Sequence, residues 1–128
     1  MSAKRAKIIK VPGTTNNITK GIINYLKSKG HFARRINTTG IFDENKKLFR
    51  RSSNKGTSDI IACVSCRNEP GGIYFGQFLA IEVKNKGTKD TLSDDQKKFG
   101  DEVVNAHGVY YTAIGYEEFV GWFESMAW

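Results

Sequence analysis

The sequence predicts a mixed α/β (α+β) fold in which a central sheet is flanked by helices. Three observations support it: segments with apolar residues at helical spacing, apolar runs at strand spacing, and their order, which is helix, strand, strand, strand, helix, strand, helix. A chain of 128 residues buries roughly two-thirds of its unfolded surface without disulfide bonds. We expect residues 14–128 to form a single domain, preceded by a flexible basic arm at residues 1–13.

The first helix is expected to begin at Thr14 or Thr15, either of which can cap it, and to run to about Lys29. Gly30 then supplies its stop. Its apolar stripe consists of Ile18, Ile22, Tyr25 and Leu26. A short strand at residues 32–36, a small β-segment within residues 41–49 and a loop at residues 50–58 follow.

The centre of the chain predicts a hairpin whose strands are Asp59 to Val64 and Ile73 to Lys84. Pro70 and Gly71 occupy the second and third positions of a type II turn signal. If Glu69 and Gly72 flank this turn, the two residue numbers of every cross-strand pair add up to 141. The numbers of Asp59 and Glu82 also add up to 141. These two acids would then sit opposite each other, roughly 4.5 to 5.5 Å apart at Cα. A bulge could instead shift the register by one residue and separate them.

The last part of the chain predicts a helix, a strand and a helix. Ser93 to Gln96 fits a capping box, and acids in the first turn favour the helix dipole. The inward stripe of this helix is expected to be Phe99, Val103 and Ala106, with His107 in its last turn and Gly108 as its end. Residues 109–114 then form a strand, and an aromatic helix occupies residues 117–126.

The second hairpin strand ends with an unusual pair of ionisable residues. Side chains alternate along a strand, so Leu79, Ile81 and Val83 share one face while Glu82 and Lys84 share the other. Charged groups beside a core cost free energy unless each has a partner. A divalent cation and a phosphate would provide those partners, which indicates a metal-dependent nuclease site.

Charge is distributed unevenly along the chain. Residues 1–56 hold fourteen Lys or Arg and two acids, a net of +12, whereas residues 57–128 hold six basic and eleven acidic residues, a net of −5. A region of one sign this long favours a nucleic-acid partner over a merely solvated surface. Two cysteines, with no signal-peptide pattern and no membrane-span pattern, favour a reduced cytoplasmic setting and no membrane association.

The residues Gly56-Thr57-Ser58-Asp59, Glu82-Val83-Lys84 and Gln96-Lys97-Lys98-Phe99, in this order, resemble the PD-(D/E)xK nuclease superfamily, and within it the stand-alone VRR-NUC type. The resemblance covers nearly the whole chain and implies a restriction-endonuclease-like sheet. It also implies that Asp59, Glu82 and the backbone oxygen of Val83 bind Mg²⁺ or Mn²⁺, and that Lys84 orients or polarises the attacking water.

The resemblance further implies a homodimer that cuts branched DNA such as Holliday junctions or flaps. The sequence departs from the superfamily in two places: Ser58 replaces the Pro of its name, and the first helix lacks the glutamate that many relatives carry. Asn16, Asn17 or Asn24 would offer a neutral substitute. Two other functions stay open, namely a nicking, restriction-type or exonucleolytic enzyme on simple DNA, and a non-catalytic nucleic-acid-binding module.

Further residues are candidates for supporting roles. Gln96 either hydrogen-bonds the nucleophilic water or Lys84, or serves the capping box alone. Cys63 and Cys66 have the spacing of half a zinc site, but no second cysteine pair exists and only His31 and His107 remain, so a zinc site is not expected. The candidates for phosphate contacts lie on segments expected near the acids, and they are Arg34, Arg35, Arg50, Arg51, Lys55, Lys86 and Lys89.

Overall fold

The computed structural model describes residues 14–36, 41–43, 48–50, 56–85 and 91–128, and for 41–43 and 48–50 the backbone alone. Within these ranges the element order is α1 (Thr15–Ser28), β1 (Phe32–Arg35), β2 (Ile41–Asp43), β3 (Leu48–Arg50), β4 (Ile60–Arg67), β5 (Tyr74–Val83), α2 (Asp94–Asn105), β6 (Val109–Ala113) and α3 (Tyr116–Ser125). The predicted order is confirmed for the helices and for β1, β4, β5 and β6, and the small β-segment expected within residues 41–49 is present as two strands, β2 and β3. The basic arm expected at residues 1–13 lies outside the described residues.

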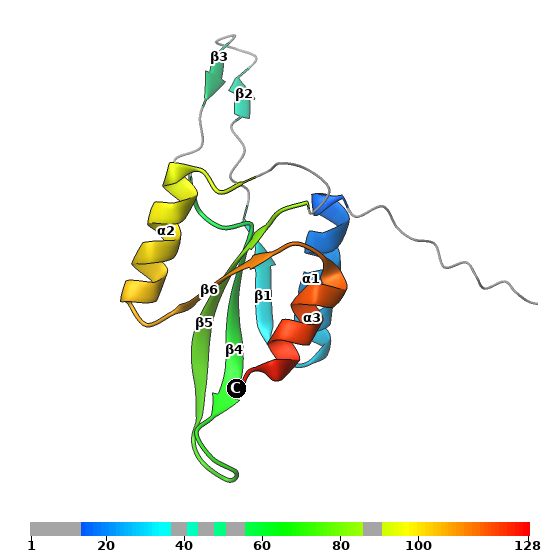
Figure 1. Ribbon diagram of the computed structural model, residues 1–128, viewed down its shortest axis with the longest axis vertical. Coiled ribbons are helices and arrows are strands. Elements are labelled where there is room, and N and C mark those ends of the chain that lie inside the picture. The colour runs from blue at the N-terminus through cyan, green and yellow to red at the C-terminus, as the bar shows by residue number, and fades with distance from the viewer. Residues whose placement is uncertain (1–13, 37–40, 44–47, 51–55, 86–90) are drawn as a thin grey trace, which may run out of the picture.

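A four-stranded sheet in the order β1-β4-β5-β6 forms the centre of the molecule (Figure 1). β1, β4 and β5 pair antiparallel, whereas β5 and β6 run parallel and are connected through α2. α1 and α3 lie together on one face of this sheet, and α2 lies on the other (Figure 1). The mixed sheet with helices on both faces is therefore the α+β fold that the sequence predicted. The segment within residues 41–49 pairs as a separate two-stranded sheet, β2 and β3.

The core fills the space between the sheet and the α1/α3 layer. Ile22 and Leu26 of α1 are fully buried, as expected from the apolar stripe, and Phe119 of α3 packs beside them. The Tyr25 hydroxyl donates a 2.8 Å hydrogen bond to Glu124, which joins the two helices. The sheet side chains in this core belong to alternate positions of each strand, and they are Ala33, Ile60, Ala62, Val64, Cys66, Leu79, Ile81, Val83 and Ala113.

The ends of α1 and α2 show how local chemistry fixes the elements. The Thr14 side chain caps α1 by accepting the Asn17 N–H, and Gly30 ends that helix with a φ of +91°. In α2 the capping box of Ser93 and Gln96 is present as predicted. The end of α2 differs from the prediction: it closes at Asn105, exposed Ala106 is its C-cap, and His107 takes the left-handed conformation with a φ of +70°.

Gly108 explains that ending of α2. Its N–H donates to the Val103 carbonyl and the His107 N–H donates to the Val104 carbonyl, which is the Schellman hydrogen-bond pair. A Cβ at Gly108 would come within 2.8 Å of the Val103 side chain and 3.2 Å of the Phe78 ring. A residue without a side chain is needed at position 108 because the chain passes close to β5 there. The residue before it, His107, therefore takes the left-handed conformation that ends the helix.

Candidate active site

Asp59 and Glu82 face each other across the β4–β5 hairpin. Ile60 pairs with Ile81, and each acid is the next residue outward from that pair, so the predicted register is confirmed. The turn behind it has the expected chemistry: the Gly72 N–H donates to the Glu69 carbonyl at 2.8 Å, and Gly71 has a φ of +79°. Asp59 stands one residue before β4 instead of opening it, and β4 runs on to Arg67. Both carboxylates lie on the α2 side of the sheet.

Backbone hydrogen bonds fix Asp59 from both neighbouring strands. The Val83 N–H donates to Asp59 Oδ2 at 2.7 Å, and the Ile36 N–H donates to the Asp59 carbonyl at 2.8 Å. The N–H and C=O of a strand residue point toward the same neighbouring strand. The Val83 carbonyl is therefore directed toward the Asp59 side of β5, while the next N–H, that of Lys84, donates to Ala113 of β6.

Glu82 is buried, with 3% of its surface exposed, and it contacts two of the other predicted residues. The Gln96 Nε2 donates to Glu82 Oε2 at 2.8 Å, and the Lys84 ammonium lies 3.8 Å from the same oxygen. Gln96 keeps its capping role as well, because its Oε1 accepts the Ser93 N–H at 2.8 Å. The capping role expected for Gln96 is therefore confirmed, and its amide binds the Glu82 carboxylate, a partner that neither alternative had named.

The geometry suits a hard divalent cation. Like charges directly opposite on adjacent strands repel, and a cation held between them would relieve that repulsion. The available donors are two carboxylates and the Val83 carbonyl, which are the oxygen ligands that Mg²⁺ prefers. Across the described part of the chain, no group of three or more His, Cys, Asp or Glu side chains is placed to hold a metal ion. The metal site would consequently depend on the backbone oxygen as its third protein ligand.

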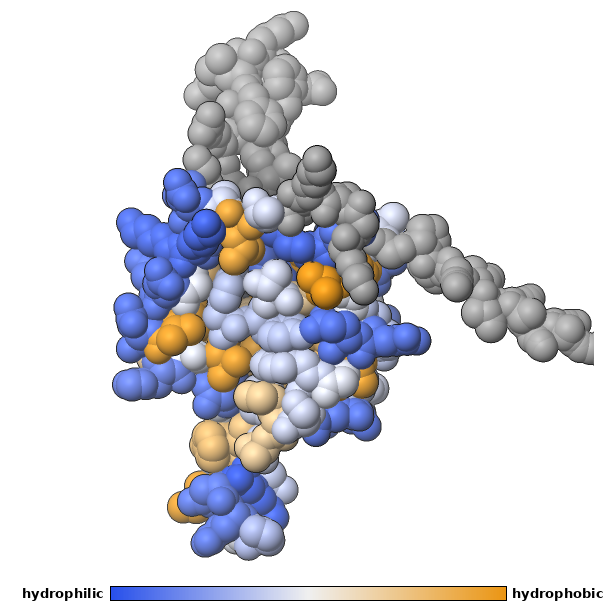
Figure 2. All heavy atoms as spheres, viewed as in Figure 1, coloured by the Kyte–Doolittle hydropathy of each residue, from blue (hydrophilic) through white to orange (hydrophobic). Residues whose placement is uncertain are grey.

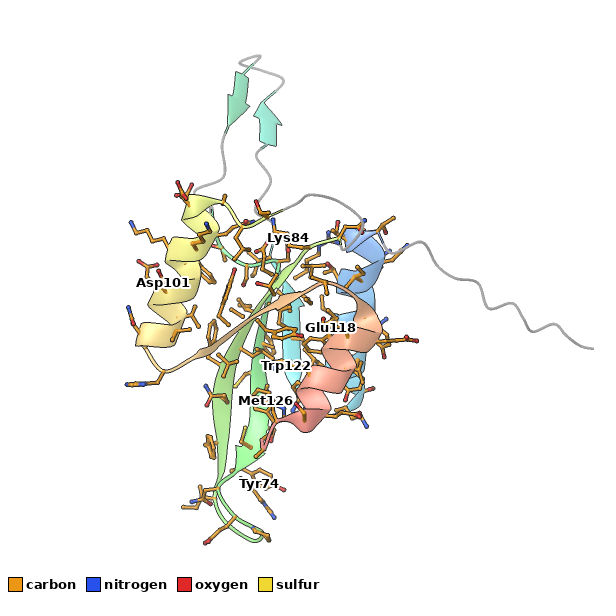
Figure 3. The ribbon with its side chains drawn as sticks, viewed as in Figure 1. Tyr74, Lys84, Asp101, Glu118, Trp122 and Met126 are labelled. Atoms are coloured by element: carbon orange, nitrogen blue, oxygen red, sulfur yellow. The ribbon has the colours of Figure 1, made fainter. Side chains whose placement is uncertain are left out.

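Lys84 and the helix ends mark the position of this site in the molecule (Figure 3). Lys84 lies at the end of the sheet where α1 and α2 begin, and Tyr74 lies at the opposite end of β5 (Figure 3). At the start of α1, Asn16 accepts a 2.6 Å hydrogen bond from Arg35. No acid occupies the first turn of α1, in agreement with the sequence.

Two glycines, Gly56 and Gly100, support the site by the way α2 packs, and the sequence patterns had not indicated these roles. Gly56 has a φ of +87°, and a Cβ there would meet the Asp95 carbonyl oxygen of α2 at 2.6 Å. Gly100 lies over the Tyr110 ring, which a Cβ would approach to 2.9 Å. These glycines let α2 pack close enough for Gln96 to reach Glu82. A glycine inside a predicted helix was the available signal for Gly100.

Tyr110 projects from β6 into the same layer as the two acids. Its hydroxyl oxygen is buried and makes no hydrogen bond with any residue that the structure describes. Burial, and then the carboxylates of Glu82 and Asp59, raise the pKa of Tyr110 to about 12. The phenol therefore stays protonated at neutral pH and retains a hydroxyl proton beside the carboxylates.

The candidate phosphate contacts are divided by the structure. Arg34 and Arg35 are neighbours on β1 and point to opposite faces, with Arg34 on the face of Asp59 and Glu82. Arg50 is the last residue of β3 instead of the start of a loop. The other four lie outside the described residues, and they are Arg51, Lys55, Lys86 and Lys89.

The cysteine pair does not form half of a zinc site. Cys66 is buried in the core and Cys63 is exposed on the opposite face of β4, so the two thiols point away from each other. His31 is engaged elsewhere, because its Nδ1 accepts the Ser65 N–H at 3.0 Å and its ring contacts Phe123. Among the helices that the structure describes, none is long and apolar enough to cross a bilayer.

Comparison with known families gives a match over most of the chain. The family model of the VRR-NUC domain matches residues 21–115, which include Gly56, Asp59, Glu82, Lys84 and Gln96. Neither a curated protein nor a solved structure gives a match. The match spans well over half of the chain, and the chain therefore belongs to the VRR-NUC family of the PD-(D/E)xK nuclease superfamily and is a nuclease.

Proposed function

We propose that this nuclease is a metal-dependent, structure-selective DNA endonuclease with Asp59, Glu82 and Lys84 at its active site. The observation that supports this most is the pairing of two carboxylates on adjacent strands with Val83 between Glu82 and Lys84. A pair of charges at an exposed strand edge would not show these features. Here Glu82 is buried and bonded by the capping residue Gln96, and Asp59 is bonded by the Val83 N–H of the neighbouring strand. The residue just before β4, the end of β5 and the first turn of α2 converge on these groups.

Mg²⁺ or Mn²⁺ fits the donor set, with Asp59, Glu82 and the Val83 carbonyl as its protein ligands. When bound, such an ion would make a water molecule more acidic and would offset the negative charge of the scissile phosphate. Lys84 adds a mobile positive charge beside the Glu82 carboxylate, suited to orienting water or a phosphate oxygen. Gln96 holds Glu82 in position, and the sheet fixes Asp59 through Val83.

We further propose branched DNA, such as a four-way junction or a flap, as the substrate and a homodimer as the active form. Both features come from the resemblance to stand-alone VRR-NUC and junction-resolving nucleases. A two-fold symmetric substrate suits a two-fold symmetric dimer. The basic first half of the chain supplies charge for phosphate contacts, which position DNA without reading its sequence.

The test compares cleavage of four-way junction, flap and linear duplex DNA by the intact chain with and without Mg²⁺ or Mn²⁺. We expect cleavage that requires the metal and favours the branched substrates. Asp59→Ala or Glu82→Ala should reduce cleavage about a thousandfold or more, since the ion supplies several kcal/mol at about 1.36 kcal/mol per decade. DNA binding should persist in both variants.

The matched control is Asp101→Ala, which removes an exposed acid from α2 five residues after Gln96. It should cut at the wild-type rate. Undiminished turnover in Asp59→Ala would refute the site. Equal cutting of linear duplex would refute the structure selectivity and favour a simpler DNA nuclease. Binding with no cleavage in either metal would indicate a binding module.

A further inference from the structure

The sheet face that carries Asp59 and Glu82 is covered by α2 on one side only. α2 packs over β6, where the Phe99 and Tyr110 rings lie 6.1 Å apart. Toward β1 the same face is open: Phe32 is 49% exposed, Phe78 is 41% exposed and Cys63 is exposed. Large apolar side chains in a continuous exposed group usually mark a binding surface.

The strand register arranges this open face in rows. Phe32, Cys63 and Phe78 form one row across three strands, because Cys63 pairs with both aromatic residues. The row between them and the acids contains Arg34, Ile61 and Ala80. Beyond the aromatic row come Ser65 with Gly76 and then Arg67 with Tyr74. We call these four rows, which begin next to Asp59 and Glu82, the open face.

Each arginine of the open face lies beside an aromatic ring. The Arg34 guanidinium lies 5.6 Å from the centre of the Phe32 ring, and that of Arg67 lies 4.0 Å from the Tyr74 ring. On β5, Gly76 separates Tyr74 from Phe78, whereas Ala80, between Phe78 and Glu82, is fully buried, so the row next to the acids is exposed mainly at Arg34. The four rows contain two positive charges and no acid.

We propose that the open face binds unpaired nucleotides of the substrate and leads them to Asp59 and Glu82. Bases would stack on Phe32 and Phe78, and Arg34 and Arg67 would contact the phosphates. Aromatic rings and arginines in a positive groove are the means by which proteins hold single strands without reading sequence. Tyr74 lies eight positions before Glu82 on β5, roughly 26 Å at about 3.3 Å per residue, which is enough for several nucleotides.

A nucleic acid fits this surface better than a second copy of the chain. The strands extend past the helices toward the Glu69–Gly72 turn, where hydrophobic side chains lie just above a hydrophilic tip (Figure 2). In a symmetric pairing of two open faces, the two arginines of each copy would face surfaces that carry the same charge. A polyanion meets both arginines with opposite charge, and its path toward Asp59 would run over exposed Arg34 and half-buried Ile61. The proposal rests on the nuclease site proposed above, for which it names the substrate feature.

The test measures binding without catalysis, by fluorescence anisotropy of the intact chain in EDTA. The probes are a labelled deoxythymidine oligomer of roughly twelve residues, long enough to follow the whole face, and a blunt duplex. Phe32→Ala should weaken binding of the oligomer about five- to a hundredfold, as loss of one stacked base predicts. Its affinity for blunt duplex should change by less than about twofold.

Phe75→Ala is the matched control. Phe75 lies on the same strand as Phe78 and is similarly exposed, at 48%, but its side chain points to the opposite face. It should bind the oligomer like the wild type. Phe32→Trp keeps a ring for stacking, so it should retain affinity, and its added fluorescence should be quenched by the oligomer above the wild-type background of Trp122 and Trp128.

Equal losses in Phe32→Ala and Phe75→Ala, or no loss in Phe32→Ala, would overturn the proposal. Failure of the wild type to bind the oligomer at low salt would do so too. A wild-type dimer that becomes a monomer in Phe32→Ala, by analytical ultracentrifugation, would assign the face to a second copy instead. Cleavage plays no part in these readouts, so strand binding by a chain that does not cut would reject the nuclease site and leave the open face standing.

Discussion

At the scale of single residues, the site depends on side chains that each have two tasks. Gln96 closes the cap of α2 with its Oε1 and holds Glu82 with its Nε2. The two tasks can be separated, because the Ser93 side chain caps α2 by accepting the Gln96 N–H, whereas the Gln96 Nε2 binds Glu82. A pair of substitutions therefore distinguishes helix stability from alignment of the metal ligand.

We predict that Gln96→Ala lowers cleavage about 10- to 100-fold and raises the metal concentration needed for half-maximal rate, as loss of a ligand's hydrogen-bond partner does. Ser93→Ala should lower the free energy of unfolding by about 1 kcal/mol and leave the metal dependence unchanged. Metal titrations of the cleavage rate, with urea unfolding alongside, measure both effects. A metal dependence shifted equally in both variants would show that Gln96 acts through the cap alone.

His31 is predicted to make stability depend on pH. Burial lowers its pKa below the usual 6.5, and its Nδ1 accepts the Ser65 N–H, so the folded state favours the neutral ring. The unfolded chain then binds more protons, and the stabilisation present above about pH 6.5 is lost as pH falls toward the folded pKa. Urea unfolding at pH 7.5 and 5.5 should show a larger loss for the wild type than for His31→Gln. Equal losses would contradict the prediction.

At the scale of elements, the β4–β5 hairpin was predictable from the sequence because the chemistry of a turn is local. Pro70 and Gly71 required one turn geometry, and that geometry set which residues pair along both strands. The first turn of α2 was predictable for the same reason. The packing of α2 was not, because Gly56 meets Asp95 across 39 residues of sequence and Gly100 meets the ring of Tyr110 on another element. Local patterns give no information about which distant backbone will approach a glycine.

Two helical glycines allow a direct test of this packing. Gly100→Ala would force the Tyr110 ring away from α2, whereas Gly121→Ala meets nothing within 4 Å. We predict that Gly121→Ala stabilises the protein by about 0.5–1 kcal/mol through helix propensity, and that Gly100→Ala destabilises it and slows cleavage. Thermal unfolding and cleavage rates provide the comparison. Stabilisation by both substitutions would mean that α2 tolerates a shift and that close packing on Tyr110 is unimportant.

At the scale of the whole molecule, the proposed metal site and the basic charge belong to different parts of the chain. The acids of the proposed metal site lie at one end of the sheet, and the first 56 residues carry a net charge of +12. The sequence predicted this asymmetry and the sheet with its helices, since composition and periodicity are visible without a structure. The openness of the sheet toward β1 was not visible, because it depends on where α2 stops covering β5.

The charge asymmetry predicts strong salt dependence of DNA binding. Each lysine or arginine that contacts a phosphate releases counterions, which lowers the logarithm of the binding constant by about 0.9 per decade of salt for duplex DNA. Binding of duplex by the Asp59→Ala variant should weaken steeply between low and moderate salt, measured by anisotropy so that cleavage does not interfere. A flat response would show that the basic half of the chain does not contact the phosphates.

The claim on which the rest depends is that Asp59, Glu82 and the Val83 carbonyl bind one divalent cation. A crystal containing Mn²⁺ measures this directly, because anomalous scattering locates the ion. We predict one peak at ordinary metal–oxygen distances from all three oxygens, about 2.0 to 2.4 Å, with the Lys84 ammonium nearby. A peak bound by one of these groups without the others, or a saturated crystal with no peak between the two acids, would contradict the account.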